Sequence, residues 1–146
     1  MVKFSIFSAR SITALFFLWL ASAASQASEI ALSIEIPRLK VAEYHRPYVA
    51  AWLQNQESKE ITNLVLWYQI DEDGKGEKWL KDLRQWWRRS GRSLDMPVDG
   101  VSGATYGPGA YELEFTSGKA PLADLKPGEY RLRVEAAREV GGRELI

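Results

Sequence analysis

One short stretch of the chain, Asp99-Gly100-Val101-Ser102-Gly103-Ala104-Thr105, combines side-chain hydroxyls with residues that have little or no side chain. The hydroxyl of Thr105 is a nucleophile that a separate enzyme could join to a phosphate, provided that this enzyme can reach the oxygen. Gly103 and Ala104 add almost no bulk beside it, and Gly100 lets the backbone follow an irregular path. We therefore expect an exposed hydroxyl in an open loop.

The same stretch resembles the acceptor motif of bacterial periplasmic flavin transferases: an Asp, a small residue, any residue, Ser or Thr, Gly, Ala, then Thr or Ser. The resemblance implies that FMN, taken from FAD, is joined by a phosphoester to Thr105. It implies cofactor-binding roles for the other motif residues, which are Asp99, Gly100, Ser102, Gly103 and Ala104. Tyr106 lies beside the acceptor and is a further candidate, because its ring could stack on the flavin. Gly107 departs from flavin-bearing domains of the sodium-pump type, which often have Ser or Thr there. Turn chemistry is the competing interpretation, since turns also favour Gly, Ser and Asp.

The N-terminus has the layout of a signal peptide. Lys3 and Arg10 precede an apolar stretch from Ile12 to Ala24, and Ser25-Gln26-Ala27 fits the small-x-small rule for cleavage after Ala27. We expect residues 1–27 to be removed and residues 28–146 to form a single domain in the periplasm. An uncleaved membrane anchor is the alternative, although the apolar stretch is short for a membrane span.

The composition of residues 28–146 excludes several classes of function. This part keeps 17 of the 19 Lys and Arg against 19 Asp and Glu, so it lacks the positive charge that nucleic-acid binding requires. The chain has no Cys, which excludes disulfides and thiolate metal sites. We therefore expect neither nucleic acid nor a metal as a ligand.

Alternation of apolar and polar residues predicts a mainly β chain. The expected strands cover residues 31–36, 47–54, 61–70, 110–115 and 129–137. Gly141-Gly142 predicts a hairpin turn into a return strand that begins at Arg143. We expect an immunoglobulin-like β-sandwich with one inserted amphipathic helix.

That helix is predicted from Lys78 to Arg89, where large apolar residues recur at spacings of three, four and seven: Trp79, Leu80, Leu83, Trp86 and Trp87. Adjacent helical residues point about 100° apart, so either Trp86 or Trp87 must lie at an edge. The stripe either packs on the core or offers a tryptophan to a flavin ring. Arg88 and Arg89 form a solvated helix end or neutralise a flavin phosphate. Residues 90–108 then form a long polar loop, and such loops are often functional.

Two other segments invite functional interpretations. His45 is the only histidine, so it is either a hydrogen-bonded loop residue or, with Tyr44 and Arg46, part of a flavin pocket. Residues 71–77 resemble a calcium loop only weakly, because Gly74 comes at the fourth position instead of the sixth and Lys75 occupies a ligand position. Neither segment predicts a metal site.

Several segments together resemble a family of predicted periplasmic proteins, domain-of-unknown-function family 2271: Ile36-Pro37-Arg38-Leu39, residues 42–50, Trp67-Tyr68, residues 77–80, Trp86-Trp87-Arg88-Arg89 and residues 135–142. The resemblance implies a sandwich fold and genes that sit near flavin transferases and membrane-bound redox or iron-related proteins. Members of the family usually continue through one more strand, so we expect this chain to be truncated at its C-terminus.

These observations lead to a functional hypothesis. We expect a periplasmic electron-transfer protein, not an enzyme, with FMN bound covalently to Thr105. Its expected partners are a periplasmic flavin transferase, which attaches the FMN, and a membrane-bound redox protein. The alternative is a non-redox periplasmic binding module associated with metal uptake or with a membrane redox partner.

Overall fold

The computed structural model describes residues 28–70, 73–139 and 141–146, so the predicted signal peptide lies outside the described residues. Ten elements follow one another: β1 (Glu29–Ile36), β2 (Tyr48–Asn55), β3 (Ile61–Tyr68), the 3₁₀ helix η1 (Lys75–Asp82), α1 (Arg84–Arg89), the 3₁₀ helix η2 (Gly91–Ser93), β4 (Ser102–Ala104), β5 (Gly109–Thr116), β6 (Tyr130–Ala137) and β7 (Arg143–Leu145). The five strands predicted from alternation and the return strand predicted after Gly141-Gly142 are all present, and β4 is additional.

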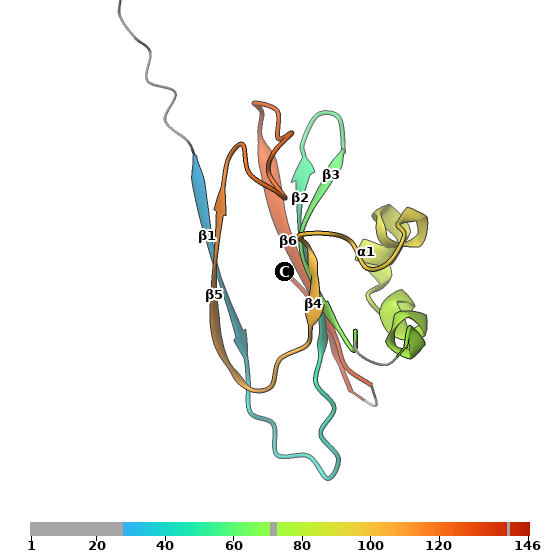
Figure 1. Cartoon of the computed structure of the whole chain (residues 1–146). Coiled ribbons are helices and arrows are strands. Elements are labelled where there is room, and N and C mark those ends of the chain that lie inside the picture. Colours follow the sequence, from blue (N-terminus) through green and yellow to red (C-terminus); the bar gives the residue numbers. More distant parts are fainter. Residues whose placement is uncertain (1–27, 71–72, 140) are drawn as a thin grey trace, which may run out of the picture.

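The strands form two sheets, which Figure 1 shows as separate layers. β1 and β5 pair antiparallel over eight residues, from Glu29↔Thr116 to Ile36↔Gly109. The second sheet has the order β4-β3-β2-β6-β7, with β4 parallel to β3 and every other pair antiparallel. The helical segments lie on the far side of this sheet from β1 and β5 (Figure 1). The expectation of a mainly β protein is confirmed.

One hydrophobic core lies between the two sheets. Leu32, Ile34 and Ile36 alternate along β1 and turn inward. They meet the inward residues of the central strands β2 and β3, which include Val49 and Trp67. Because successive side chains of a strand point to opposite faces, the remaining residues of β2 and β3 face the helical layer.

The second core lies between the five-stranded sheet and the helical segments. Trp52, Leu66 and Tyr68 from the sheet pack with Leu80, Leu83 and Trp86 from the helices, and each of these residues is buried. Gly91 lies so close to Trp86 that a Cβ there would stand 2.4 Å from the indole ring. A glycine is therefore required at this contact.

The prediction of a single helix over residues 78–89 is wrong in one respect. The segment is a 3₁₀ helix that ends at Asp82 and an α-helix that begins at Arg84, separated by Leu83 with φ −76° and ψ 70°. The buried residues Leu80, Leu83 and Trp86 are three apart, which is the period of a 3₁₀ helix. Trp79 is consequently only half-buried. Trp86 is buried and Trp87 half-buried, as the 100° angle between adjacent helical residues predicts.

A buried carboxylate ties α1 to the sheet. Glu135 on β6 is fully buried, and its Oε2 accepts hydrogen bonds from the backbone N–H groups of Gln85 and Trp86, each at 2.9 Å. These N–H groups belong to the first turn of α1, where backbone donors have no partner within the helix. Arg143 Nη1 lies 3.7 Å from the other carboxylate oxygen and balances its charge.

Candidate functional site

The stretch Asp99–Thr105 is a turn followed by an edge strand, and the prediction of an open loop here is wrong. Ser102–Ala104 form β4, which pairs with Leu66, Trp67 and Tyr68 of β3 at the edge of the five-stranded sheet. The alternation of side chains did not reveal this strand, because it is three residues long and contains no large apolar residue. Pairing with β3 fixes its backbone instead.

Ser102 closes the turn that leads into β4. Its backbone N–H donates to the Val98 carbonyl at 2.9 Å, and its hydroxyl accepts from the Val98 N–H at 2.9 Å. Gly100 has φ 66°, a left-handed conformation that glycine adopts without strain. Asp99, Gly100 and Ala104 are exposed, whereas Ser102 and Gly103 are half-buried. Asp99, Gly100 and Ser102 thus have the positions that turn chemistry requires.

Thr105 is buried, with 6% of its surface exposed, contrary to the expectation of an accessible hydroxyl. Its backbone N–H donates to the Tyr68 carbonyl at 3.0 Å and so continues the pairing of β4 with β3. Its hydroxyl donates to the carbonyl of Pro47, and its own carbonyl accepts from Arg46 Nη1 at 3.3 Å. Residues 46 and 47, which lead into β2, therefore hold both the side chain and the backbone of Thr105.

An aromatic cluster lies beside Thr105. Tyr106 is 44% exposed, and its ring centroid is 4.7 Å from Trp67 and 4.5 Å from Tyr111. The Tyr111 hydroxyl donates to the Gly107 carbonyl at 2.9 Å, which fixes the ring beneath Tyr106. A Cβ added at Gly103 would stand 3.6 Å from the Trp67 indole, an ordinary contact distance. An aromatic cluster of rings packed edge-on or tilted therefore reaches solvent at Tyr106, one residue after Thr105.

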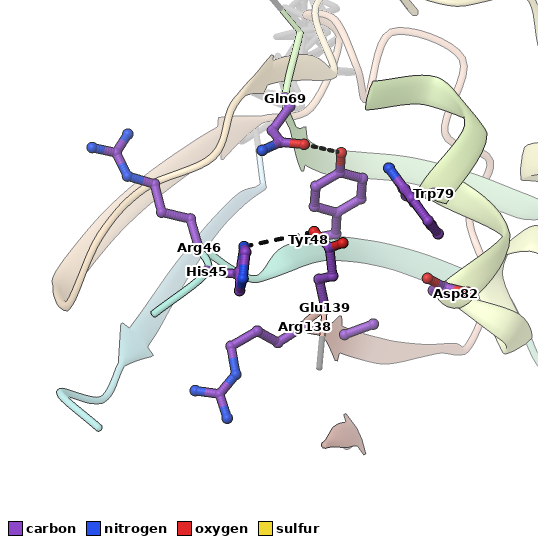
Figure 2. Close-up of a pocket in the computed structure, with 9 residues that line it drawn as sticks. His45, Arg46, Tyr48, Gln69, Trp79, Asp82, Arg138 and Glu139 are labelled. Atoms are coloured by element: carbon purple, nitrogen blue, oxygen red, sulfur yellow. Dashed lines mark hydrogen bonds and ion pairs between the residues drawn. The ribbon is translucent and has the colours of Figure 1, made fainter. Parts of the chain in front are cut away.

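Charged residues gather around His45, where Figure 2 shows Arg46, Arg138 and Glu139 nearby. His45 lies between two carboxylates, with Nε2 3.1 Å from Glu43 and Nδ1 3.6 Å from Glu139. Arg46 and Arg138 both extend away from Tyr48 and Trp79 in this view. The cavity among these residues has a volume of about 20 Å³, which is room for one water molecule. This cavity has no room for a flavin ring, and the interpretation of Tyr44, His45 and Arg46 as part of a flavin pocket stays a hypothesis.

Tyr68 lies behind the motif on the helical side of the sheet. Burial raises the pKa of its hydroxyl above the ordinary value of 10.0, and the negative charge of Glu77 raises this pKa further. The Ser102 side chain beside it acts in the opposite direction. The backbone carbonyl of Tyr68 accepts the hydrogen bond from Thr105. Tyr68 therefore contacts the motif through its backbone and belongs to the second core through its side chain.

Sequence reasoning found the motif and Tyr106 but missed Pro47, Trp67 and Tyr111. Pro47 is 58 residues from Thr105 in the chain, and no local spacing predicts that contact. Arg88 and Arg89, which were considered for a flavin phosphate, are exposed at the end of α1. There the Arg88 Nε donates to the Arg84 carbonyl, as expected of a solvated helix end.

The described part of the chain holds no group of three or more His, Cys, Asp or Glu residues arranged to bind a metal ion. Asp71 and Glu72, from the segment compared with a calcium loop, lie outside the described residues. No helix within the described ranges is long and apolar enough to cross a membrane.

Comparison with known proteins gives one match. A family model described as predicted periplasmic protein (DUF2271) matches residues 29–146, which are all but one residue of the predicted mature chain. Neither the curated proteins nor the solved structures contain a match. The family description agrees with the periplasmic location that the signal sequence predicts. The chain therefore belongs to the DUF2271 family of predicted periplasmic proteins.

Proposed function

We propose that this periplasmic protein carries FMN, bound through a phosphoester to Thr105, and transfers electrons. The observation that carries the proposal is the match of all defining positions of the acceptor motif between Asp99 and Thr105. The chain itself supplies no catalytic group in this proposal. A separate periplasmic flavin transferase attaches the FMN, and a membrane-bound redox protein exchanges electrons with it.

The residues around Thr105 suit such a group. Tyr106 offers an exposed aromatic ring that Trp67 and Tyr111 support from behind, and aromatic rings of this kind stack on flat ligands. Arg46 already bonds the Thr105 carbonyl, so its guanidinium stands close enough to hold a phosphate on the neighbouring side chain. The FMN, when bound, would supply reversible electron transfer, while the protein positions it and sets the charge around it.

Attachment requires a local opening of the site. The Thr105 hydroxyl must leave the Pro47 carbonyl before its oxygen can bond to the phosphorus of FAD, with loss of the hydroxyl proton and release of AMP. β4 pairs with one neighbour over only three residues, and short edge segments of this kind open at low free-energy cost. We infer that the transferase acts on this open form.

The proposal extends to the class of fold. We assign an immunoglobulin-like β-sandwich with an inserted helical segment between β3 and β4. The support is the packing of β1 and β5 against the antiparallel strands β2, β3 and β6. The parallel pairing of β4 with β3 then marks the acceptor segment as an addition at the sheet edge.

The alternative function is a non-redox periplasmic binding module. One observation favours it: the Thr105 hydroxyl is already used in a buried hydrogen bond, as a purely structural threonine would be. The two functions differ in whether a verified transferase labels the protein.

The test is coexpression of the exported protein with an active periplasmic flavin transferase, followed by denaturing gel electrophoresis with flavin fluorescence. We expect a fluorescent band that survives denaturation and is absent without the transferase. Thr105→Val keeps the shape of the side chain and should abolish the band, whereas Thr105→Ser should retain part of it. Ser102→Ala is the matched control, because Ser102 is the nearest other hydroxyl in the motif, and it should stay fluorescent.

Two results would count against the proposal. Fluorescence lost with Ser102→Ala and kept with Thr105→Val would move the attachment to Ser102. An unlabelled native sequence, in cells where the transferase modifies a known acceptor, would leave the binding module as the function.

A further inference from the structure

The two-stranded sheet covers only part of the face on which it packs. Beyond the outer edge of β1 lies an open groove of about 700 Å³, bounded by β1 on one side and by β6 and β7 on the other. Its apolar lining includes Leu32, Ile34, Leu132, Val134 and Ala136. We propose that this groove binds an extended segment of a partner protein, which adds a strand to the outer edge of β1.

Among the residues that the structure describes, none pairs with the backbone of β1 on the side of the groove. Within the described residues β1 pairs only with β5. The Ser117 N–H donates to the Ser28 carbonyl at 2.8 Å, so the pair Ser28–Ser117 is a hydrogen-bonded pair of the ladder. Hydrogen-bonded and non-bonded pairs alternate along antiparallel strands, so Ala31, Ser33 and Glu35 direct their N–H and C=O groups away from β5. A row of free donors and acceptors therefore faces the place where a further strand would lie.

The side chains of the groove match such a strand. Leu132 and Val134 lie two residues apart on β6 and point to the same face, and Ala136 continues the row. Leu132 is 39% exposed although it is a large apolar residue. A segment paired with β1 would place every second side chain over this row, so its apolar residues must also alternate. The charged residues of the lining are two acids and two bases, Glu35, Glu144, Arg138 and Arg143, and so demand no net charge of the segment.

The unpaired backbone of β1 favours a peptide over other ligands of the groove. A lipid chain or an apolar small molecule would fill the groove but leave the N–H and C=O groups of β1 without partners. The β1 strand of a second folded copy is also unsuited. Its apolar face, which includes Leu32 and Ile34, already packs on the five-stranded sheet of its own chain. An extended segment of another protein satisfies both the backbone and the apolar lining. This inference does not depend on FMN at Thr105.

The probe for this site is a fluorescent ten-residue peptide of alternating valine and threonine, with a lysine at each end. We expect saturable binding to the mature protein, measured by fluorescence anisotropy. Hydrogen exchange of the Ala31, Ser33 and Glu35 amides should slow in the complex. A peptide of the same composition with its valines in adjacent pairs should bind at least tenfold more weakly, because half of its apolar side chains would face solvent. N-methylation of the alternate amides that would pair with β1 should also abolish binding.

A matched pair of variants locates the site. Leu132→Lys places a charge in the groove and should weaken peptide binding at least tenfold. Leu145→Lys introduces the same change at a residue with the same 39% exposure, and Leu145 is paired with Glu135 on the opposite face of the sheet. It should leave binding unchanged.

Each contrary result overturns the proposal. Equal effects of the two variants, or full binding by the N-methylated peptide, would show nonspecific adhesion to apolar surface. Absence of binding by the alternating peptide would show that β1 does not accept a strand. A dimer in sedimentation that dissociates with Leu132→Lys would assign the groove to a second copy of the chain.

Discussion

The helical layer packs on its face of the five-stranded sheet from β3 across to β6. On the other face, the two-stranded sheet covers β6 only partly and leaves an open groove beside β6 and β7. On the helical face, the exposed fraction of Leu80, Leu83 and Trp86 is at most 1% for each residue. On the groove face, Leu132 stays 39% exposed. The same strands thus support a closed core on one side and an open apolar surface on the other.

This difference separates stability from binding. Residues of the closed face lose contacts on every side when they are truncated, so substitutions there should lower the free energy of unfolding. Residues of the open face have few contacts to lose, and substitutions there should change what the protein binds. The acceptor segment is intermediate, because Thr105 is buried although it follows an edge strand of three residues.

The largest effect should come from truncating a leucine on the closed face. Leu83→Ala should lower the free energy of unfolding by about 2–5 kcal/mol, since the residue is fully buried in the core between the helical segments and the sheet. Leu132→Ala, the same truncation on the open face, should cost less than about 1 kcal/mol. Urea denaturation of both variants measures the contrast, and equal losses would mean that the groove is as closed as the helical face.

Removal of the buried charge on β6 should have the next largest effect. Glu135→Gln should cost about 1.5–3 kcal/mol, because a neutral amide replaces the carboxylate that accepts from Gln85 and Trp86. The control is Glu129→Gln, an exposed residue just before β6, which should change stability little. If the two variants melted at the same temperature, the carboxylate would not be what holds α1 on the sheet.

A smaller loss is expected at the acceptor residue. Thr105→Val keeps the volume of the side chain but leaves the Pro47 carbonyl without its donor, at a cost of about 0.5–1.5 kcal/mol. Hydrogen exchange should show faster opening of β4 without a change in the amides of β2. A variant as stable as the native chain would mean that the hydroxyl is not held by Pro47 in solution, and that it is already free for modification.

The smallest effect concerns alkaline pH. Because burial raises the pKa of Tyr68 in the folded state, the unfolded chain loses this proton first, near the ordinary value of 10.0. The stability that the neutral hydroxyl contributes is fully present below that pH and is lost as the pH rises toward the folded pKa. Denaturation series between about pH 8 and 11 should therefore show a steeper decline for the native chain than for Tyr68→Phe. Parallel curves would contradict the raised pKa.

The five strands of eight residues were predictable because their side chains alternate, but the helical layer was predictable only in part. A spacing of three between Leu80, Leu83 and Trp86 fits both a 3₁₀ and an α-helix, and only packing on the sheet decides between them. The side chains of β4 show no alternation of apolar and polar residues. This strand forms because its backbone pairs with β3, which the local sequence does not indicate.

The candidate site was predictable as a motif but not as a surface. The order of residues from Asp99 to Thr105 is visible in the sequence, whereas the burial of Thr105 depends on Pro47 and Arg46, more than fifty residues away in the chain. Tyr106 was recognised because it is adjacent to the acceptor. Trp67 reaches it through the pairing of β4 with β3, which local spacing does not reveal, whereas Tyr111 follows soon after in the chain and is held by its hydrogen bond to Gly107.

The most direct test of the central claim is mass spectrometry of the tryptic peptide that spans residues 93–119, from protein exported by cells with an active flavin transferase. Cleavage after Arg92 and Lys119 isolates the whole acceptor segment in one peptide. The account predicts a mass increase of FMN less water on this peptide, localised to Thr105 by fragmentation. An unmodified peptide, with the transferase shown to modify another acceptor in the same cells, would contradict the account.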